Sequence, residues 1–488
     1  MNHDLRAEKA RRVTEEGPGE WMHDEPAGGR VIPASWTDAH VAEVLADHLQ
    51  GRWLYVAAWG RWLRWDGTRW AHDDTEAVHE EARSWVIELV ATVAAIGASA
   101  DDVKRAATYR NRSKLESAMT MARRVQGIAA SPSEFDLDPD LLNVANGVLD
   151  LRTGNLLEHD PARRITKLAP VEYDIDAQHR DVDELLEVVD ADVRPWLQRV
   201  FGYAATGHTS EDLALVLDGT GANGKTTLLE AVGSVLGDYA GAVAPQLVMK
   251  TSHDQHPTVK ADLRGKRLVW ISETEEGGAL RVEQVKALTG GDQISARFMY
   301  GDLFTFAPSH LLVIATNHRP SVNTTEHAAW RRLRLVPFPH TYKPEHEAGP
   351  GDRVQDRGLR HRLATGRAQR EALLAWIVRG AFDWNQSGLG ACGTVDAATA
   401  AWKLREDVLG RFIAEVIEFD PHSEVKGKEL YLAYKDWCTQ EGRPAKSNKN
   451  FAADFTEHQV VIGAGIEKVT RHQVAHYRGL KVRFDAAF

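Results

Sequence analysis

The sequence predicts an α/β fold that is centred on a strand, a glycine-rich loop and a helix. The apolar run Leu213–Leu217 is uninterrupted and short enough for one buried strand. The next segment, Gly219–Thr226, fits G-x-x-x-x-G-K-[ST] at every position, and a helical pattern of apolar residues follows from Thr227. Two more apolar runs, within 266–273 and at 311–315, predict further strands of a parallel sheet.

The glycine-rich loop indicates a bound nucleoside triphosphate. Glycines let backbone N–H groups curl around phosphate oxygens, and the following helix adds positive potential at its N-terminus. Lys225 would reach the β- and γ-phosphates, and the Thr226 hydroxyl would bind Mg²⁺. The residues expected to hold the cofactors, ATP and Mg²⁺, are Gly219, Thr220, Gly221, Ala222, Asn223, Gly224, Lys225, Thr226 and Thr227.

Composition is that of an ordinary multidomain chain. The length of 488 residues predicts roughly three or four domains, and 43% apolar with 26% charged residues is typical of a globular protein. Cys392 and Cys438 are too few for a zinc cluster or a disulfide framework, which favours a reducing cytosol. We expect neither a signal peptide nor a membrane span. The net charge of −11 argues mildly against a chain coated with nucleic acid, so local basic clusters matter more.

The first third of the chain is expected to form a loose tail, residues 1–34, and a mainly helical domain with small β elements, residues 35–190. Ser35 is the expected cap of the first helix. Five tryptophans surround a hairpin turn at Asp66-Gly67, and we expect them to hold a small sheet against helices, with base stacking as the alternative.

Two long helices are predicted next, at about 75–98 and 101–127. The second is strongly basic beyond its acidic start; its cations are Lys104, Arg105, Arg110, Arg112, Lys114, Arg123 and Arg124. Such a helix either follows a nucleic-acid backbone or is simply a solvated face, and the sequence leaves both readings open. Two short strands around 152–155 and a helix at 193–205 then lead into the nucleotide-binding core, expected at 191–345.

Polar residues at two strand ends are candidates for catalysis. Glu273 directly follows the second apolar strand, where a carboxylate can hold Mg²⁺ or polarise the attacking water. Glu275 or Glu276 could share that role. Asn317 follows the third strand, and its amide could orient the water between the γ-phosphate and the acid.

A hairpin and two arginines complete the predicted core. Alternating residues on either side of Tyr300-Gly301-Asp302 predict a hairpin within 294–310. Arg331 and Arg332 precede another apolar strand at 335–338, and arginine near a nucleotide can stabilise charge on the transferred phosphoryl group, often from a neighbouring subunit.

A helical connector is expected at 346–410, followed by a small independent module at 411–488. Helices at 428–437 and 448–457 precede predicted strands near 459–462 and 479–484, which is the outline of a winged helix. Between 443 and 483 there are eight basic and three acidic residues, a local reversal of the chain's charge that fits a nucleic-acid-facing element. The DNA contacts expected there are Lys446, Lys449, Arg471 and Arg478.

The order of these motifs resembles the superfamily 3 helicases of viruses, phages and plasmids. The stretches that carry the resemblance are GTGANGKTT, RLVWISETEEGGAL, KALTGGDQISARF, LLVIATNHRP and AWRRLRLVPF. More narrowly, the chain resembles the helicase part of the phage/plasmid and poxvirus-type primase–helicases, without the primase–polymerase domain. NVANGVLDLRTGNLLEHDP resembles the pre-helicase domain of that family, and LYLAYKDWCTQEGRP with the basic tail resembles its winged-helix module.

The resemblance implies an AAA+-like ATPase core and a role for each candidate residue. Lys225 and Thr226 would be the Walker A pair, Glu273 the Walker B acid and Asn317 the sensor-1 amide. Arg332, or Arg331 in its place, would be the arginine finger. Such proteins form hexameric rings that pull single-stranded DNA through and unwind forked DNA with 3′–5′ polarity. The segment 297–304 would be the channel hairpin, with Arg297 and Tyr300 as DNA contacts, although its tip lacks the expected lysine or histidine.

The expected function is therefore ATP-dependent unwinding of DNA in a phage, prophage or plasmid replication system, in the cytoplasm of a bacterial host. A separate primase or replication initiator is a potential partner. Two alternatives are an AAA+ ATPase that remodels or loads replication proteins, and a nucleotide-assembled DNA-binding initiator. Asp136-Leu137-Asp138 and Asp174-Ile175-Asp176 match the D-x-D pattern of a primase, but neither follows an apolar strand, so no primer synthesis is expected.

Overall fold

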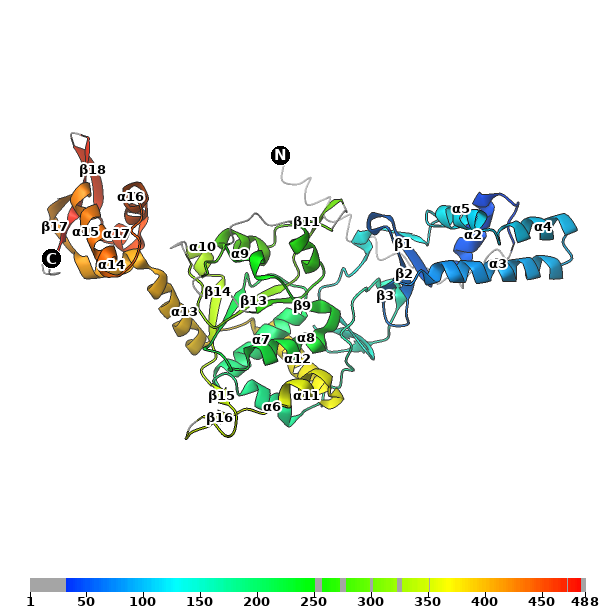
Figure 1. Ribbon diagram of the computed structural model, residues 1–488, viewed down its shortest axis with the longest axis horizontal. Coiled ribbons are helices and arrows are strands. Elements are labelled where there is room, and N and C mark those ends of the chain that lie inside the picture. Colours follow the sequence, from blue (N-terminus) through cyan, green and yellow to red (C-terminus); the bar gives the residue numbers. More distant parts are fainter. Residues whose placement is uncertain are drawn as a thin grey trace, which may run out of the picture. The chain divides into compact units, whose positions relative to one another are not determined.

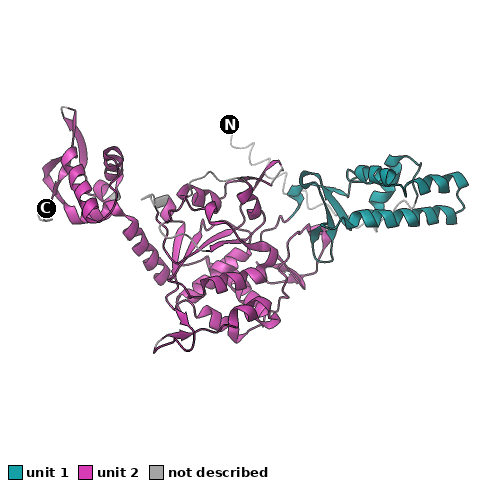
Figure 2. Ribbon diagram, viewed as in Figure 1, with its two compact units in different colours: residues 1–135 teal, residues 136–488 magenta. Residues whose placement is uncertain are grey.

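The computed structural model divides into two compact units, residues 1–135 and 136–488 (Figure 2). The structure describes residues 32–250, 257–272, 278–298, 302–322, 327–350, 352–471 and 473–483. Among the helices of these ranges, none combines the length and apolar character needed to cross a bilayer.

From residue 32 onward, the described part of the first unit is a four-stranded sheet with four α-helices (Figure 1). Its elements are α2 (Asp38–Leu49), β1 (Trp53–Val56), β2 (Arg61–Trp65), β3 (Trp70–His72), α3 (Ala77–Ala95), α4 (Ala100–Thr108), α5 (Arg112–Ala122) and β4 (Ala129–Ala130). The strands lie in the order β3-β2-β1-β4, and β2 and β3 form the expected hairpin. Trp53, Trp62 and Trp70 are buried, as expected for tryptophans that hold the sheet in place.

Two local predictions in this unit are wrong. The cap of α2 is Thr37, whose hydroxyl accepts from the His40 N–H at 3.4 Å, rather than Ser35. The basic segment 101–127 is two helices instead of one, because the chain turns after Tyr109. The Tyr109 ring is buried, and burying it in the core ends α4.

The second unit is built on a five-stranded parallel sheet in the order β14-β8-β13-β10-β9. The strands are β8 (Ala214–Asp218), β9 (Ala240–Ala242), β10 (Leu268–Ser272), β13 (Leu311–Thr316) and β14 (Leu333–Pro337). The strands predicted at 213–217, within 266–273 and at 311–315 are thus confirmed, and all lie in one mixed α/β unit. Continuous apolar runs are needed here because a parallel sheet is covered on both faces.

Alternate residues of the strands face two separate cores. Leu215 and Leu217 of β8 pack with helices α7 (Val193–Ala205), α8 (Lys225–Leu236) and α12 (Arg367–Ser387). Ala214 and Val216 face the other core, with α9 (Val282–Thr289) and α13 (Gly393–Glu406). Because successive side chains of a strand point to opposite faces of the sheet, each strand contributes residues to both cores.

Shorter elements complete the unit. They are β5 (Leu141–Val144), β6 (Gly147–Asp150), β7 (Leu156–Leu157), α6 (Arg180–Leu186), η6 (Pro257–Leu263), β11 (Ile294–Arg297), β12 (Leu303–Phe306), α10 (His327–Trp330), β15 (Tyr342–Lys343), β16 (Arg353–Val354) and α11 (Leu359–Thr365). Residues 142–149 share the core of α7, α8 and α12, so the compact unit begins well before residue 191. The five-part domain division itself stays a prediction.

The C-terminal segment has a core of its own, which contains Phe412, Trp437, Phe451 and Tyr477. Its elements are α14 (Val408–Val416), β17 (Ile417–Lys426), α15 (Gly427–Gln440), α16 (Asn448–Glu457), α17 (Gln459–Gly463), β18 (Glu467–Arg471) and β19 (Val474–Val482). The predicted strand near 459–462 is wrong, because this segment forms helix α17. The strands pair in the order β17-β19-β18, so β17 adds a strand that the sequence did not indicate.

Candidate nucleotide-binding site

The loop between β8 and α8 depends on glycine at several positions. Gly221, Ala222 and Gly224 have φ of 104°, 49° and 81°. A Cβ on Gly224 would lie 2.4 Å from Val188 Cγ1, and one on Gly219 would lie 2.8 Å from a backbone carbonyl oxygen. Positive φ favours glycine at 221 and 224, and close approach leaves no room for a side chain at 219 and 224, whereas Ala222 adopts positive φ without being glycine.

Lys225, the first residue of α8, has its ammonium inside the curve of the loop. Its Nζ donates to the carbonyl oxygen of Gly219 at 2.8 Å, to Asn223 Oδ1 at 3.3 Å and to Asn317 Oδ1 at 3.1 Å. Burial lowers the pKa of Lys225 from its ordinary value. All three acceptors are neutral, so the positive charge is hydrogen-bonded without being cancelled by a contacting carboxylate.

Strand pairing brings Asn317 to this point. β13 lies next to β8 in parallel register, with Thr316 opposite Asp218. Because the carboxyl ends of parallel strands meet at one edge of the sheet, the residue after β13 comes beside the loop after β8. The structure therefore unites Lys225 and Asn317, which are 92 residues apart in sequence.

The structure describes only some of the residues that the sequence predicts to hold Mg²⁺. Thr226 lies exposed in the first turn of α8, where its hydroxyl fits a Mg²⁺ bound to phosphates. β10 ends at Ser272, opposite Ala315 of β13. The predicted acids Glu273, Glu275 and Glu276 lie outside the described residues. Within the described ranges, no group of three His, Cys, Asp or Glu side chains is placed to hold a metal.

Arg331 and Arg332 lie at the opposite end of the sheet. β14 runs parallel to β8, with Leu333 opposite Ala214, so residues just before β14 lie at the amino ends of the strands. Both arginines pair with Asp212, at 3.5 Å from Arg331 and 3.2 Å from Arg332. The Arg331 side chain is 54% exposed, whereas that of Arg332 is 12% exposed. Neither arginine joins the phosphate loop of its own chain.

The predicted hairpin is confirmed as β11 and β12, which pair from Ile294–Phe306 to Arg297–Leu303. Tyr300 lies outside the described residues. The structure adds an aromatic cluster that the sequence analysis overlooked: the rings of Phe298 and Phe304 stack at 4.9 Å. Its signal was the alternation of phenylalanines along 298–306.

The basic residues of the C-terminal segment are mostly paired with acids. Lys446 contacts Asp454 at 2.6 Å. Arg471 and Arg478 both contact Glu424, at 3.5 and 3.1 Å. These acids are local competitors of a phosphate, which the count of charges along the sequence could not show. Lys449 is exposed on α16.

One pair beside the loop was missed. Asp218, at the end of β8, accepts from Arg319 Nε at 2.8 Å. Arg319 follows Asn317 by two residues, so its place at the same sheet edge could have been inferred from the sequence. This pair places a second cation at the edge that carries Lys225.

The two D-x-D stretches have structural roles. Asp136 binds the backbone N–H and hydroxyl of Thr166 at 2.8 and 2.5 Å, and Asp138 pairs with Arg152 at 3.2 Å. Asp174 accepts from the N–H of Asp176 at 3.0 Å within an exposed turn. The expected absence of primer synthesis stays a prediction.

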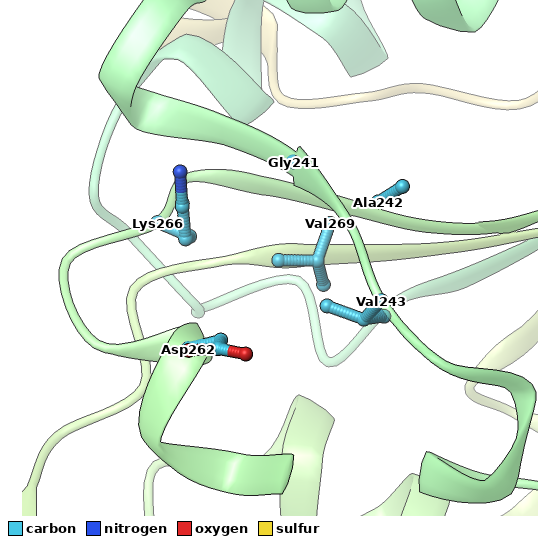
Figure 3. A pocket seen from close by; sticks show the side chains of 6 residues that line it. All are labelled: Gly241, Ala242, Val243, Asp262, Lys266 and Val269. Carbon is cyan, nitrogen blue, oxygen red and sulfur yellow. The ribbon is translucent and has the colours of Figure 1, made fainter. Parts of the chain in front are cut away.

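A cavity of about 280 Å³ opens beside the edge strand β9 (Figure 3). Its lining residues are Gly241, Ala242, Val243, Asp262, Lys266 and Val269. Lys266 Nζ donates to the carbonyl oxygens of Asp238 and Ala240, at 2.9 and 2.8 Å. None of the residues predicted to bind nucleotide lines this cavity.

Two family models match the chain. Residues 42–200 match the family described as D5 N terminal like, and residues 217–332 match a family of unknown function, DUF5906. The second match contains Lys225, Asn317 and Arg332.

Curated relatives come from large DNA viruses. The "Putative primase" of African swine fever virus is 26% identical over 328 residues, which cover 62% of this chain and 34% of that protein. A "Putative helicase" of Acanthamoeba polyphaga mimivirus is 24% identical over 339 residues, covering 66% of this chain and 35% of that protein. The chain thus spans about a third of the length of these relatives.

A solved structure, the A form apo structure of the NrS-1 C-terminal region, covers 91% of this chain and all of that chain, with 10% identity and a TM-score of 0.47. The chain is related to viral proteins named as primases and helicases.

Proposed function

We propose that this chain is an ATP-dependent DNA helicase of a phage, prophage or plasmid replication system. The observation that carries the proposal is the 3.1 Å contact between Lys225 Nζ and Asn317 Oδ1. It brings the cation of a phosphate loop and the amide of the neighbouring strand to one point, as attack of water on a γ-phosphate requires. Similarity to viral primases and helicases supports DNA as the partner.

The residues divide the reaction among them. Backbone N–H groups of 219–224 bind the phosphates, and Lys225 stabilises the charge on their β- and γ-oxygens. Asn317 Oδ1 accepts from Lys225 and leaves the amide Nδ2 to orient a water for attack. Mg²⁺, held by the Thr226 hydroxyl and by Glu273, would neutralise charge on the triphosphate. Glu273 is also our choice for the base, with Glu275 and Glu276 as substitutes.

The arginines support action between subunits. Arg331 and Arg332 stand at the end of the sheet away from their own loop, so an arginine that completes a site must act on a neighbouring chain. We therefore include a homo-oligomeric ring, of hexameric form, in the proposal. The greater exposure of Arg331 makes it the better candidate, ahead of the more buried Arg332.

DNA would be contacted by two regions. Arg297 and Tyr300 belong to the hairpin segment, and the stacked pair Phe298 and Phe304 adds aromatic faces for bases. In the C-terminal segment the order α14-β17-α15-α16-α17-β18-β19 supports a winged helix. Its proposed DNA contacts are Lys446, Lys449, Arg471 and Arg478. All but Lys449 must first break an ion pair with a carboxylate before they can bind a phosphate.

The test is ATP hydrolysis and unwinding of a forked duplex by the full chain. Lys225→Ala is expected to lower kcat for ATP by about 100-fold or more and to abolish unwinding. Lys266→Ala is the control, because Lys266 is a partly buried lysine that also donates to backbone carbonyls but lies at the amino end of β10, away from the loop. It should leave hydrolysis per folded molecule unchanged.

Two results would replace the helicase proposal. Hydrolysis that a protein partner stimulates but single-stranded DNA does not would favour the ATPase that remodels other proteins. Nucleotide-dependent DNA binding without hydrolysis would favour the initiator. Template-dependent primer synthesis by the purified chain would show a primase activity that we do not expect.

A further inference from the structure

The corner between α4 and α5 carries a concentration of exposed cations. We call it the α4–α5 corner; its members are Lys104, Arg105, Arg110, Arg112 and Lys114. Both helices lie on the same side of α3 (Figure 1). The whole chain has a net charge of −11, so a local excess of this kind is not a product of overall composition.

The five cations differ in their partners. Arg105 pairs with Asp101 at 2.8 Å, and Lys114 pairs with Asp38 at 3.0 Å. Lys104, Arg110 and Arg112 contact no carboxylate within ion-pair distance in the part of the chain that the structure describes. Three positive charges are therefore left to interact with solvent and counterions.

The turn that presents Arg110 is firmly held. Tyr109 is buried, and its hydroxyl donates to Asp38 Oδ1 at 2.8 Å. Lys114 Nζ donates to the same oxygen. Lys114 also lies 5.8 Å from the centre of the Tyr109 ring. Because the backbone is already ordered, a partner that binds here has only to order side chains.

The C-terminal segment provides the contrast. There Lys446, Arg471 and Arg478 are already paired with carboxylates, so binding a phosphate requires that an ion pair be broken first. At the α4–α5 corner no such exchange is needed for three of the five cations. Displaced counterions then provide the driving force in full.

We propose that the α4–α5 corner binds the phosphodiester backbone of DNA through Lys104, Arg110 and Arg112. This inference rests on the proposed function, which makes DNA the partner, and adds a contact surface in the first unit. The nearest exposed large apolar side chains along the chain, Ile96 and Met121, lie beyond both ends of the corner, so none stands among its cations. Contacts to the backbone alone predict binding with little dependence on base sequence.

The experiment measures the salt dependence of DNA binding by the full chain, with single-stranded and duplex oligonucleotides in separate arms. The test variant is Lys104→Gln/Arg110→Gln/Arg112→Gln. The slope of log K against log salt is negative, and loss of three phosphate contacts should make it less negative by about 2 for single strands and by about 3 for duplex. At about 0.1 M salt, relative to 1 M, this corresponds to binding that is about 100-fold weaker for single strands and about 500-fold weaker for duplex. The arm in which the slope changes by its predicted amount, while the slope in the other arm stays at the wild-type value, identifies the form of DNA that the corner binds.

A control variant removes the same charge from cations that are already paired. In Arg52→Gln/Arg61→Gln/Arg83→Gln, the arginines lose contacts to Glu81, Asp74 and Glu80. This variant should retain the wild-type slope to within about one contact. Thermal melting and ATP hydrolysis without DNA should match wild type for both variants, since neither touches the nucleotide site.

The outcomes separate the two proposals. Wild-type protein that binds no DNA at any salt concentration would overturn the proposed function and this inference together. Wild-type binding with an unchanged slope in the test variant would overturn only the inference, as would an equal change in the control. Binding of phosphatidylserine vesicles that the test variant loses, with DNA binding intact, would assign the corner to a membrane instead.

Discussion

Removal of the arginines before β14 tests whether each site is completed by a neighbouring chain. The register of β14 on β8 sets Leu333 opposite Ala214 and Pro337 opposite Asp218. Four residue rises therefore separate the arginine end from the loop end of the sheet, about 13 Å at the usual strand rise. This separation places Arg331 and Arg332 beyond the reach of their own triphosphate. Arg331→Ala/Arg332→Ala should accordingly lower kcat by about 1000-fold or more while nucleotide binding changes little.

The double variant should fold normally. Asp212, the partner of both arginines, has a side chain that is 37% exposed, so water can solvate its carboxylate after the substitution. The exposed pair of Arg331 with Asp212 contributes at most about 1 kcal/mol, whereas the Arg332 side chain is 12% exposed and its removal should cost more, so Arg331→Ala alone is the milder companion variant. A thermal melt of the variant that matches that of the wild type shows that the fold is intact, so that lost activity reflects the catalytic step.

The decisive assay mixes this variant with Lys225→Ala before the ring assembles. Each variant alone should be inactive. In a random one-to-one ring, a site is complete where a chain with Lys225 meets a neighbour with both arginines, which gives about a quarter of the wild-type rate. A mixture as inactive as its parts would show that the arginines do not act across the interface, and the proposed ring mechanism would be refuted.

Three further predictions test the fold around the site. Gly202→Ala should destabilise the protein by about 1–3 kcal/mol, because a Cβ would lie 2.0 Å from a backbone nitrogen of α12, whereas Gly393→Ala, with nothing within 4 Å, should be neutral or stabilising in chemical denaturation. Gly224→Ala should weaken nucleotide binding by calorimetry, since the new methyl group would lie 2.4 Å from Val188; unchanged affinity would contradict the tight loop. Burial lowers the pKa of His310 to about 4, so the unfolded chain, with its ordinary pKa of 6.5, takes up the proton first. Stability should thus be complete above pH 6.5 and fall as the pH drops toward 4, by about 2 kcal/mol between pH 7 and 5, a loss that His310→Leu should reduce.

Local sequence patterns predict an element correctly where the residues of that one segment decide its secondary structure. The run of apolar residues before Gly219 predicts a covered strand because no exposed strand tolerates such a run. The helix at 193–205 was placed at the bounds of α7. Patterns predict the wrong element where other parts of the fold determine the structure of a segment. The chain turns at the buried Tyr109, which divides the predicted basic helix in two. Residues 459–463 form helix α17, although their apolar residues suit a strand equally well.

For the site, the sequence by itself determined the chemistry of each member: the glycines, the lysine and the threonine of the loop follow from their spacing alone. Only the tertiary structure decided which members meet. Parallel pairing of β8 and β13 brings Asn317 to Lys225, and the parallel register of β14 sends Arg331 and Arg332 to the far end of the sheet. Whether a basic residue is paired with an acid also depends on the tertiary structure. The ion pair of Arg478 with Glu424 joins residues 54 positions apart, and a count of charges along the chain does not show which of them are close in space.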